Sequence, residues 1–484
     1  MKRHAPYLAL LVCLTSSWPL HASARVVAHS AAAASRDGNA PQSTTASVDA
    51  QAALTQTDGL LKQAREAGTN YANNKDDQSK KTAKKSLEEA EKLMKEALKH
   101  DPACEKCTEQ LARAYLYKSY FGFEKDYDDC IKVAAQGLTR FPSNVPLAYI
   151  KGVAHYNSGQ HGEAVKALNR YLAGATGDPQ GTAQAQKLLQ DSQQRFMVSW
   201  YKHADYYQSK DSRIEAMGAG FKPVTIFQVT PQWELQLGGQ AFAAVTNASP
   251  TLQDQEIQTY VESLVSRLTS KTPGPNFTYK VTILKSPAVN AMTVPGHVFV
   301  NLGLFAFAES ESEFVGVLAH EMGHNYGHHA GRRFIKAIQA QQIANLAAAL
   351  VNPQNQMAQL ATQLAGQIGV NLFLLAYSRG EEKEADLYGA HLMYNAGYDP
   401  TALSVFFTKM FKANPKQPVR FLSTHPPVPE RATYLIDYTE AFPLGSSEVK
   451  TDSAEFQKIR ARVLNAMQSA PGQQAPGKAV LPPL

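Results

Sequence analysis

The sequence predicts a mainly helical α+β protein, in which an N-terminal domain of helical repeats precedes a second domain with a small β-sheet. Three observations support this fold class. Apolar and small residues recur at three- and four-residue steps through long segments on both sides of the middle of the chain. Short runs at 277–283 and 298–300 show the alternation of strands. Hydrophobic residues make up 44 % of the 484 residues, which excludes a wholly disordered chain.

The charge balance argues against a nucleic-acid-binding protein. The chain has 48 Lys and Arg against 42 Asp and Glu, a net charge of +6, with no Lys/Arg-rich arm that carries interleaved aromatic residues. Four cysteines are too few for a disulfide-built scaffold. The positions of the 14 histidines say more about function than their number does, because four of them fall within residues 320–329.

Residues 1–24 have the three parts of a secretory signal peptide. Two basic residues open the segment, an apolar stretch follows at 7–14, and residues 22–24 form an Ala-Ser-Ala cleavage pattern. The apolar stretch is too short to span a bilayer, and the next candidate, 335–377, is interrupted by Gln, Asn and Pro. We therefore expect a chain secreted across the inner membrane into the periplasm, without a transmembrane segment once the signal is removed.

The three cysteines beyond the signal segment lie close together in the sequence. Disulfides persist in an oxidising compartment, so we expect Cys130 to pair with Cys104 or Cys107. The Cys-x-x-Cys spacing of the latter two also occurs in redox motifs and zinc knuckles. Neither a second ligand pair nor a βαβ pattern accompanies it here, which disfavours both alternatives.

The first half of the chain divides by composition. Residues 25–80 are rich in Ala, Ser, Thr, Gln and Asp and lack sustained apolar periodicity, so we expect a flexible linker. Residues 81–205 have a helical pattern instead, beginning with Leu87, Ala90 and Met94.

Residues 81–205 resemble tetratricopeptide repeats, whose period is about 34 residues. A small residue precedes a closing proline by 12 positions twice, and the spacing of Gly152 and Ala164 suits a third unit. Pro102 and Pro142 are 40 residues apart, so one loop would carry an insertion of about six residues against that period. Such repeats stack into a surface that holds a protein partner. The alternative is an ordinary helical bundle with no binding role.

Residues 213–440 are expected to form the second domain. A helix is predicted at 253–268, followed by the two strands. A further helix begins at Ser310, which forms a capping box with Glu313, and Gly331 suits the end of that helix.

Two later segments are less regular. Residues 334–373 form either a helical lid or ordinary packing. In 441–484 we expect an amphipathic helix at 453–467 and a disordered tail rich in Pro, Gly and Gln.

The helix after Ser310 contains the sequence His-Glu-Met-Gly-His. His320 and His324 are four residues apart and share a helix face, so both can present a ring nitrogen to one metal ion. Glu321 stands between them, where it can take a proton from a water bound to that metal. This is the motif of zinc peptidases.

Two histidines do not complete a catalytic zinc site, which usually has three protein ligands. Glu382 and Asp386 are four residues apart on a second predicted helix. One carboxylate can bind zinc, and the other can accept the free N–H of a ligating histidine. Gly389 and Ala390 continue the same face with little bulk, which lets two helices approach closely.

These motifs resemble the gluzincin metalloendopeptidases of the HtpX/BepA type, the family that includes the CAAX prenyl protease. That family carries H-E-x-x-H and, about sixty residues later, S-R-x-x-E-x-x-A-D, and both occur here at 320–324 and 378–386. The similarity spans about residues 217–440. It implies a zincin-type domain with one Zn²⁺ per chain, held by His320, His324 and Glu382.

The resemblance also implies roles for neighbouring residues. Glu321 is then the general base and Asp386 the carboxylate that holds a ligating histidine. Glu381 and Glu384 become solvated charges. His329 matches a family histidine and His328 is expected at the surface, with neither on zinc.

Two further segments match the family. Residues 290–296 are similar to its N-A-F-A-x-P-G segment, which would place Asn290 and Ala291 beside an extended substrate. The T-H-P motif and the arginine six residues later match His425 and Arg431. His425 then either reaches the zinc as a switch or stabilises an oxyanion, the alternative being an ordinary loop residue. Arg431 is expected to be an ion-pair partner near the site.

The function implied by the resemblance is a zinc metalloendopeptidase of envelope protein quality control. Its substrates would be misfolded or mis-assembled proteins, and the repeats would bind a further protein partner. The family's BepA type carries its repeats after the peptidase domain, whereas here they precede it, so the partner does not carry over. The rival hypothesis is a chaperone-like periplasmic binding factor whose protease site is latent behind His425.

Overall fold

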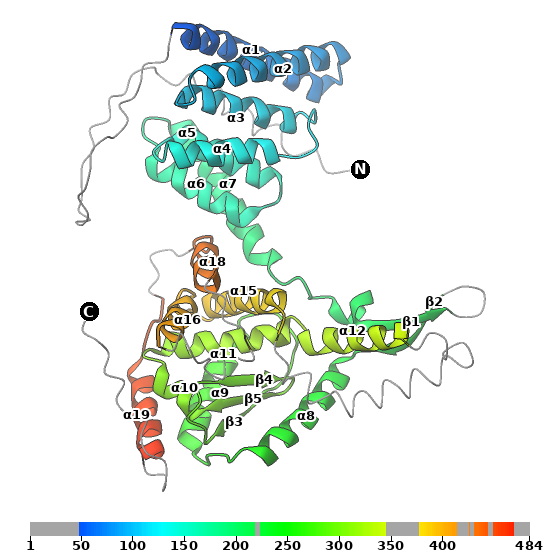
Figure 1. The fold of residues 1–484 in the computed structure, drawn as a ribbon, viewed down its shortest axis with the longest axis vertical. Coiled ribbons are helices and arrows are strands. Elements are labelled where there is room, and N and C mark those ends of the chain that lie inside the picture. The colour runs from blue at the N-terminus through cyan, green and yellow to red at the C-terminus, as the bar shows by residue number, and fades with distance from the viewer. Residues whose placement is uncertain are drawn as a thin grey trace. The chain divides into compact units, whose positions relative to one another are not determined.

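A computed structural model of the chain describes residues 48–217, 223–344, 377–413, 425, 430–443 and 449–468 (Figure 1). It divides into two compact units, 1–196 and 197–484. The expected signal peptide, the tail after residue 468 and most of the expected lid lie outside the described residues. The predicted fold class is confirmed, because a helical N-terminal region precedes a region of helices and small sheets.

The N-terminal unit is built from successive helices, and each of the first six packs on its neighbour in the sequence. Its elements are α1 (Val48–Asn74), α2 (Asp77–His100), α3 (Glu105–Tyr120), α4 (Asp128–Arg140), α5 (Val145–Asn157), α6 (His161–Gly174) and α7 (Pro179–Ser199). The predicted helical region is therefore observed, and the expected longer loop lies between α3 and α4. Gly137 and Gly152 allow close packing, because a Cβ at either would lie under 3.0 Å from a leucine side chain.

The linker predicted at 25–80 is helical where the structure describes it, from Val48 onward. The buried residues of α1 recur every three or four positions, at Ala50, Leu54, Thr57, Leu61 and Ala64. Two alanines and a threonine make this a weakly apolar stripe, so it escapes a search for apolar periodicity. The helix is stabilised by packing on α2 and α3.

The prediction that Cys130 forms a disulfide is wrong. Cys104 and Cys107 bond to each other, and Cys130 is a free buried thiol. Cys130 lies inside α4, where its Sγ faces the Ala112 carbonyl oxygen at 3.4 Å. Burial raises the pKa of this thiol.

The second unit contains two small sheets among helices (Figure 1). Its elements are η2 (Tyr206–Gln208), η3 (Lys210–Ser212), β1 (Arg213–Met217), β2 (Pro223–Gln228), α8 (Pro231–Ala248), α9 (Gln255–Ser270), β3 (Lys280–Leu284), β4 (Ala291–Val294), β5 (His297–Asn301), α10 (Leu302–Phe307), α11 (Glu311–Tyr326), α12 (His329–Ala344), α15 (Arg379–Asn395), α16 (Ala402–Ala413), α18 (Glu430–Thr439) and α19 (Ala454–Gln468). The three-stranded sheet has the order β3-β5-β4, with β5 parallel to β3 and antiparallel to β4. The predicted strands and the helix near 253–268 are confirmed.

The turn between β4 and β5 follows from its sequence. Pro295 and Gly296 connect Val294 to His297, which pair across the hairpin. Gly296 has φ +82°, a conformation that a residue with a Cβ rarely adopts.

The helix that carries the His-Glu-Met-Gly-His motif ends earlier than predicted. Ser310 caps its start by accepting the Glu313 amide, as expected, but α11 stops at Tyr326 with Gly327 at its C-cap. Gly331 lies inside the next helix, α12, so its expected role as a helix stop is wrong. A Cβ on Gly331 would lie 2.7 Å from Glu234 Oε1, so the small residue is needed for close packing.

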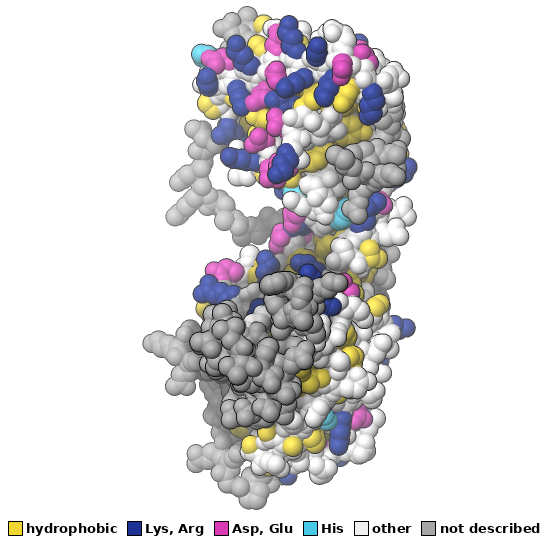
Figure 2. Space-filling model, turned by 90° about the vertical axis from the view of Figure 1, so that its right-hand side faces the viewer, with side chains coloured by type: hydrophobic (Ala, Val, Ile, Leu, Met, Phe, Trp, Pro, Cys, Tyr) yellow, Lys and Arg dark blue, Asp and Glu magenta, His cyan; other side chains and the backbone are white. Residues whose placement is uncertain are grey.

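The predicted C-terminal helix is present as α19, which packs on α9 and α10 through Phe456, Ile459 and Val463. No helix among the described residues is long and apolar enough to cross a membrane. On the face drawn in Figure 2, acidic side chains lie among the basic ones over the N-terminal unit, which agrees with the absence of a basic arm in the sequence.

Candidate metal centre

The site is built on two helices that touch almost backbone to backbone. A Cβ on Gly323 of α11 would lie 2.4 Å from the Ala385 carbonyl oxygen of α15, and one on Gly389 would lie 3.0 Å from the His320 nitrogen. The small residue predicted at 389 therefore permits the contact, and Gly323 does so from the other helix. A capping box between Ser378 and Glu381 fixes the start of α15.

Four side chains converge in this contact: His320, His324, Glu382 and His425. Each is at most 4 % exposed, and one ligand atom from each lies within 4.8 Å of every other. The Nε2 atoms of His320 and His324 are 3.3 Å apart, and Glu382 oxygens lie 3.6 and 3.7 Å from them. Tetrahedral zinc with bonds of 2.0–2.1 Å separates its ligands by about 3.3 Å. The three predicted ligands are thus spaced for one such ion.

His425 closes the fourth corner of this group. Its Nδ1 is 3.3 Å from His320 Nε2 and 2.9 Å from Glu382 Oε1. Its Nε2 is 3.2 Å from Glu321 Oε1. Although burial opposes it, the Glu321 and Glu382 carboxylates raise the pKa of His425.

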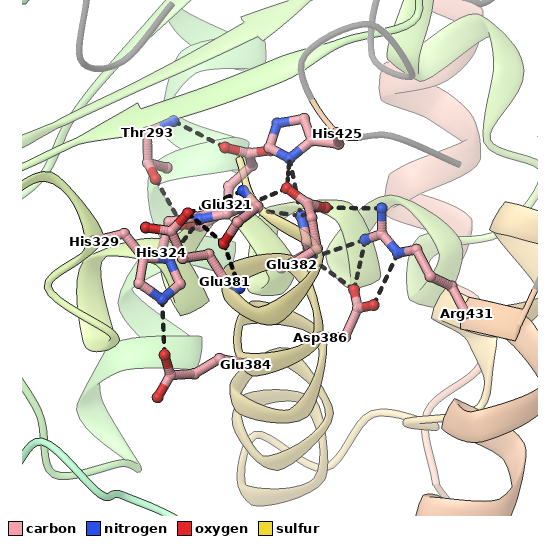
Figure 3. Close-up of polar contacts among 12 residues, drawn as sticks. Thr293, Glu321, His324, His329, Glu381, Glu382, Glu384, Asp386, His425 and Arg431 are labelled. Carbon is pink, nitrogen blue, oxygen red and sulfur yellow. Dashed lines mark hydrogen bonds and ion pairs between the residues drawn. The ribbon is translucent and has the colours of Figure 1, made fainter. Parts of the chain in front are cut away.

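Glu321 is held between the site and the sheet. The Thr293 amide of β4 donates to Glu321 Oε2 at 3.2 Å, and the Thr293 hydroxyl donates to the Glu321 carbonyl oxygen at 2.7 Å (Figure 3). Burial raises the pKa of Glu321, which is only 2 % exposed. A carboxylate with a raised pKa is suited to take up and release a proton near neutral pH.

Two buried carboxylate oxygens at the site form no hydrogen bond with the described residues. They are Glu321 Oε1 and Glu382 Oε2. Glu321 Oε1 lies 3.2 Å from His425 Nε2, and Glu382 Oε2 lies 2.8 Å from an Arg431 nitrogen. Each carboxylate oxygen keeps a further lone pair that can accept a cation or a polar ligand. Two imidazoles and a carboxylate around such a space are the donor set of a catalytic zinc. The residues present therefore fit a metal ion.

His320 is oriented directly by a buried carboxylate. Its Nδ1 is 2.8 Å from Asp386 Oδ1. Arg431 donates two hydrogen bonds to Asp386, at 2.7 and 2.9 Å, and Tyr434 donates a third. Burial alone would raise the pKa of Asp386, but Arg431 and His320 hold it well below its ordinary value. Arg431 also lies 2.8 Å from Glu382 Oε2, so the ion-pair partner expected near the site is in place.

His324 is oriented through a second imidazole. Its Nδ1 lies 2.8 Å from His329 Nδ1, and His329 Nε2 lies 3.0 Å from Glu384 Oε2. Glu384 is itself held by Arg332 at 2.7 Å and by His203 at 2.8 Å. Figure 3 shows the two carboxylates on separate sides of the site, with Glu384 beside His329 and Asp386 beside Arg431.

An aromatic ring covers the face of His324. Tyr377 stacks on it with ring centres 3.7 Å apart. Arg333 lies over Tyr377 at 4.0 Å and pairs with Glu381. Hydrogen bonds from Arg333 and Ser378 outweigh burial and lower the pKa of Glu381 to about 2.

Three expectations about this region are wrong. Glu381 and Glu384 are not solvated charges, because both are partly buried in ion pairs that anchor α15 to α12. His328 is not at the surface: it is 2 % exposed, stacks on Tyr206 and lies 3.1 Å from Glu234 Oε2. Polar residues are usually expected at the surface, because burying them costs free energy unless they are paired. The sequence does not show the partners that offset this cost for these three residues.

The residues proposed to contact substrate lie at the sheet edge. Ala291 is the first residue of β4, opposite Val300, and is buried. The Asn290 carbonyl oxygen accepts the Asn301 amide at 3.1 Å.

Comparison with known proteins identifies this region. Residues 251–439 match the model of peptidase family M48. Residues 251–439 are therefore similar to a domain of this peptidase family and are called the M48 domain below. The M48 domain contains every residue of the four-residue cluster, so the resemblance inferred from the motifs is confirmed. The cluster therefore lies in the part of the chain that is similar to these peptidases, and its residues could hold a metal ion.

The M48 domain has relatives in bacteria and in mitochondria. A putative beta-barrel assembly-enhancing protease of Vibrio cholerae is 28 % identical over 225 residues, which cover 44 % of this chain and 46 % of that protein. The beta-barrel assembly-enhancing protease of Escherichia coli is 26 % identical over 253 residues, half of each chain. The mitochondrial metalloendopeptidase OMA1 of Schizosaccharomyces pombe is 27 % identical over 201 residues, 40 % of this chain and 56 % of that protein. The chain spans about half the length of these relatives.

Proposed function

We propose that this protein is a zinc-dependent metalloendopeptidase. The observation that carries the proposal is the spacing of His320, His324 and Glu382, whose ligand atoms lie 3.3 to 3.7 Å apart beside a buried glutamate. These three residues would hold the zinc, which would supply a Lewis acid for the scissile carbonyl and for a water molecule.

Glu321 is the general base in this proposal. Its Oε1 lies 3.2 Å from His425 Nε2 without a hydrogen bond of good geometry, so it keeps a lone pair that can accept a proton from the attacking water. The same carboxyl group can then return that proton to the leaving amine. Thr293 holds the other oxygen and so keeps Glu321 in one orientation.

The edge of β4 supplies a binding site for an extended peptide. The Thr293 amide donates to Glu321 and therefore points away from β5. Residues two apart in a strand point their backbone groups the same way, so the Ala291 amide and carbonyl also face outward. A substrate strand pairing there would pass over Glu321, which supports a binding role for Ala291. The Asn290 carbonyl faces β5 instead, where it accepts the Asn301 amide, so any contact of Asn290 with substrate would come from its side chain.

The proposed substrates are misfolded or mis-assembled envelope proteins in the periplasm. The names of two relatives support this, since they describe proteases that enhance beta-barrel assembly. The predicted signal peptide at 1–24 agrees with this location. The helical N-terminal unit, with its tetratricopeptide-like pattern, would bind a protein partner.

A second candidate function is supported by the position of His425. Its Nδ1 occupies the corner of the cluster where a catalytic water would approach, and its Nε2 contacts the proposed base. In that arrangement the protease is latent, and the chain acts as a binding or assembly factor until His425 moves away.

Cleavage of casein and of an unfolded outer-membrane protein distinguishes these functions. We expect Glu321→Gln to lower the cleavage rate about 10²- to 10⁴-fold with zinc retained, because a general base contributes about that factor. Equal cleavage by wild type and Glu321→Gln would refute the proposed base. Cleavage by His425→Ala alone would favour the latent protease.

A further inference from the structure

The His329 imidazole touches the metal-ligating His324 but does not belong to the four-residue ligand cluster. It begins α12, two residues after the Gly327 cap of α11. His328 between them has φ +49°, a left-handed conformation that turns the chain sharply. This turn directs the His329 ring back toward His324 and not along the helix.

With a metal bound at His324, the protons on the His324 and His329 rings can be placed in only one consistent way. A zinc ion held by His324 would take the lone pair of Nε2, so His324 would carry its proton on Nδ1 and donate it. His329 Nδ1, at 2.8 Å, must then be the acceptor. The proton of neutral His329 therefore lies on Nε2, which faces Glu384 Oε2 at 3.0 Å.

Glu384 is well placed to impose that tautomer. An ionised carboxylate only accepts hydrogen bonds, so it selects the form of His329 with a proton on Nε2. Arg332 donates to the same oxygen, while His203 and Tyr388 approach the other at 2.8 and 3.3 Å. Four groups thus hold the carboxylate in place.

We propose that His329, with its tautomer fixed by Glu384, is a positioning residue that orients His324 for the metal. This inference rests on the proposed zinc site. It extends the ligand-orienting machinery from Asp386 alone to a two-step relay on the other side of the cluster. Removing such a partner typically lowers metal affinity 10- to 100-fold.

Three substitutions at 329 separate positioning from packing. In His329→Asn the side-chain amide oxygen takes the place of Nδ1, so an acceptor for His324 is kept. In His329→Gln the amide lies near the position of Nε2 and leaves no acceptor near that of Nδ1. His329→Phe keeps an aromatic ring but has neither the acceptor for His324 nor the donor to Glu384. Zinc affinity of the full-length chain is measured by competition with a chromophoric chelator, and site geometry by Co²⁺ absorption. We expect the Phe and Gln variants to bind zinc 10- to 100-fold more weakly and the Asn variant within a few-fold of wild type.

His391→Gln is the matched control. His391 is a fully buried histidine on α15 that bonds Tyr438 at 2.8 Å and lies outside the cluster, so its loss should not move zinc affinity. Equal affinity in wild type and His329→Phe would overturn the proposal, as would equal losses in all three variants at position 329. Imidazole ¹⁵N shifts of the zinc-bound wild type give a second test, since a proton on Nδ1 of His329 also contradicts it. A wild type that binds no zinc would instead refute the proposed function.

Discussion

The two histidines of the metal site are oriented by different means, although both stand on α11. His320 meets a carboxylate directly, since Asp386 is fully buried and doubly bonded to Arg431. His324 meets its carboxylate, Glu384, through His329, and both Glu384 and Arg332 keep about a fifth of their side chains exposed. A buried ion pair is costly to break, whereas a partly exposed one is screened by water. The Asp386 side should therefore be the more rigid and the more sensitive to substitution.

Of the substitutions around the two histidines, Asp386→Ala should lower zinc affinity and stability the most. It removes the acceptor of His320 and leaves the buried Arg431 with Glu382 as its charged partner among the described residues. We expect zinc affinity to fall by about 100-fold, the upper end of the usual range for such a partner. The free energy of unfolding should fall by about 3–5 kcal/mol, because a buried charge loses its partner. Chelator competition and urea unfolding measure the two quantities. A loss below that of Glu384→Ala in both would reverse the proposed order.

Glu384→Gln should lower zinc affinity only through its effect on the orientation of His329. We expect about a tenfold loss of zinc affinity, and little further loss when it is combined with His329→Phe, because the two residues form one relay. Combined with Asp386→Asn, its effect should add, since the two carboxylates hold different ligands. Additivity of Glu384→Gln with His329→Phe would show that no relay exists.

His203→Ala should have a smaller effect. His203 contacts Glu384 Oε1 at 2.8 Å, but Arg332 still holds the other oxygen after the substitution. A loss of zinc affinity of about threefold or less follows, in line with a partly exposed contact. A loss as large as that of His329→Phe would mean that His203 positions the ligand more directly than its contacts indicate.

His391→Gln should leave zinc affinity unchanged and alter acid stability instead. Burial lowers the pKa of His391 to about 3 in the folded chain. In the unfolded chain the histidine takes up a proton near pH 6.5, whereas in the folded chain it stays neutral down to about pH 3. This histidine therefore removes stability as pH falls from about 6.5 to 3. The variant should lose less stability than wild type over that interval in urea unfolding. Parallel pH profiles for the two proteins would contradict the burial effect.

Much of the metal centre could be predicted from the sequence, because helix geometry converts spacing into position. His320 and His324 share a face by their four-residue step, and Glu382 with Asp386 share one on α15. The small residue at Gly389 correctly indicated close helix packing. His425 required a matched family motif, because its approach depends on the fold and not on local periodicity.

The rest could not be predicted from spacing, for reasons that are equally local. His329 lies five residues from His324, which is not a shared helix face, and it reaches that residue only because α11 ends and His328 turns the chain. Glu384 resembles any solvated helix charge until its partners on α12 and at His203 are known. In the first unit, α1 was missed because its buried stripe includes two alanines and a threonine.

The most direct test of the account is the zinc content of the purified chain. The protein is isolated without chelators, and its metal is quantified by mass spectrometry in wild type and in a His320→Ala/His324→Ala variant. The cluster predicts one zinc per chain in wild type and none in the variant. Wild-type protein without stoichiometric zinc, or zinc that persists in the variant, would contradict the central claim.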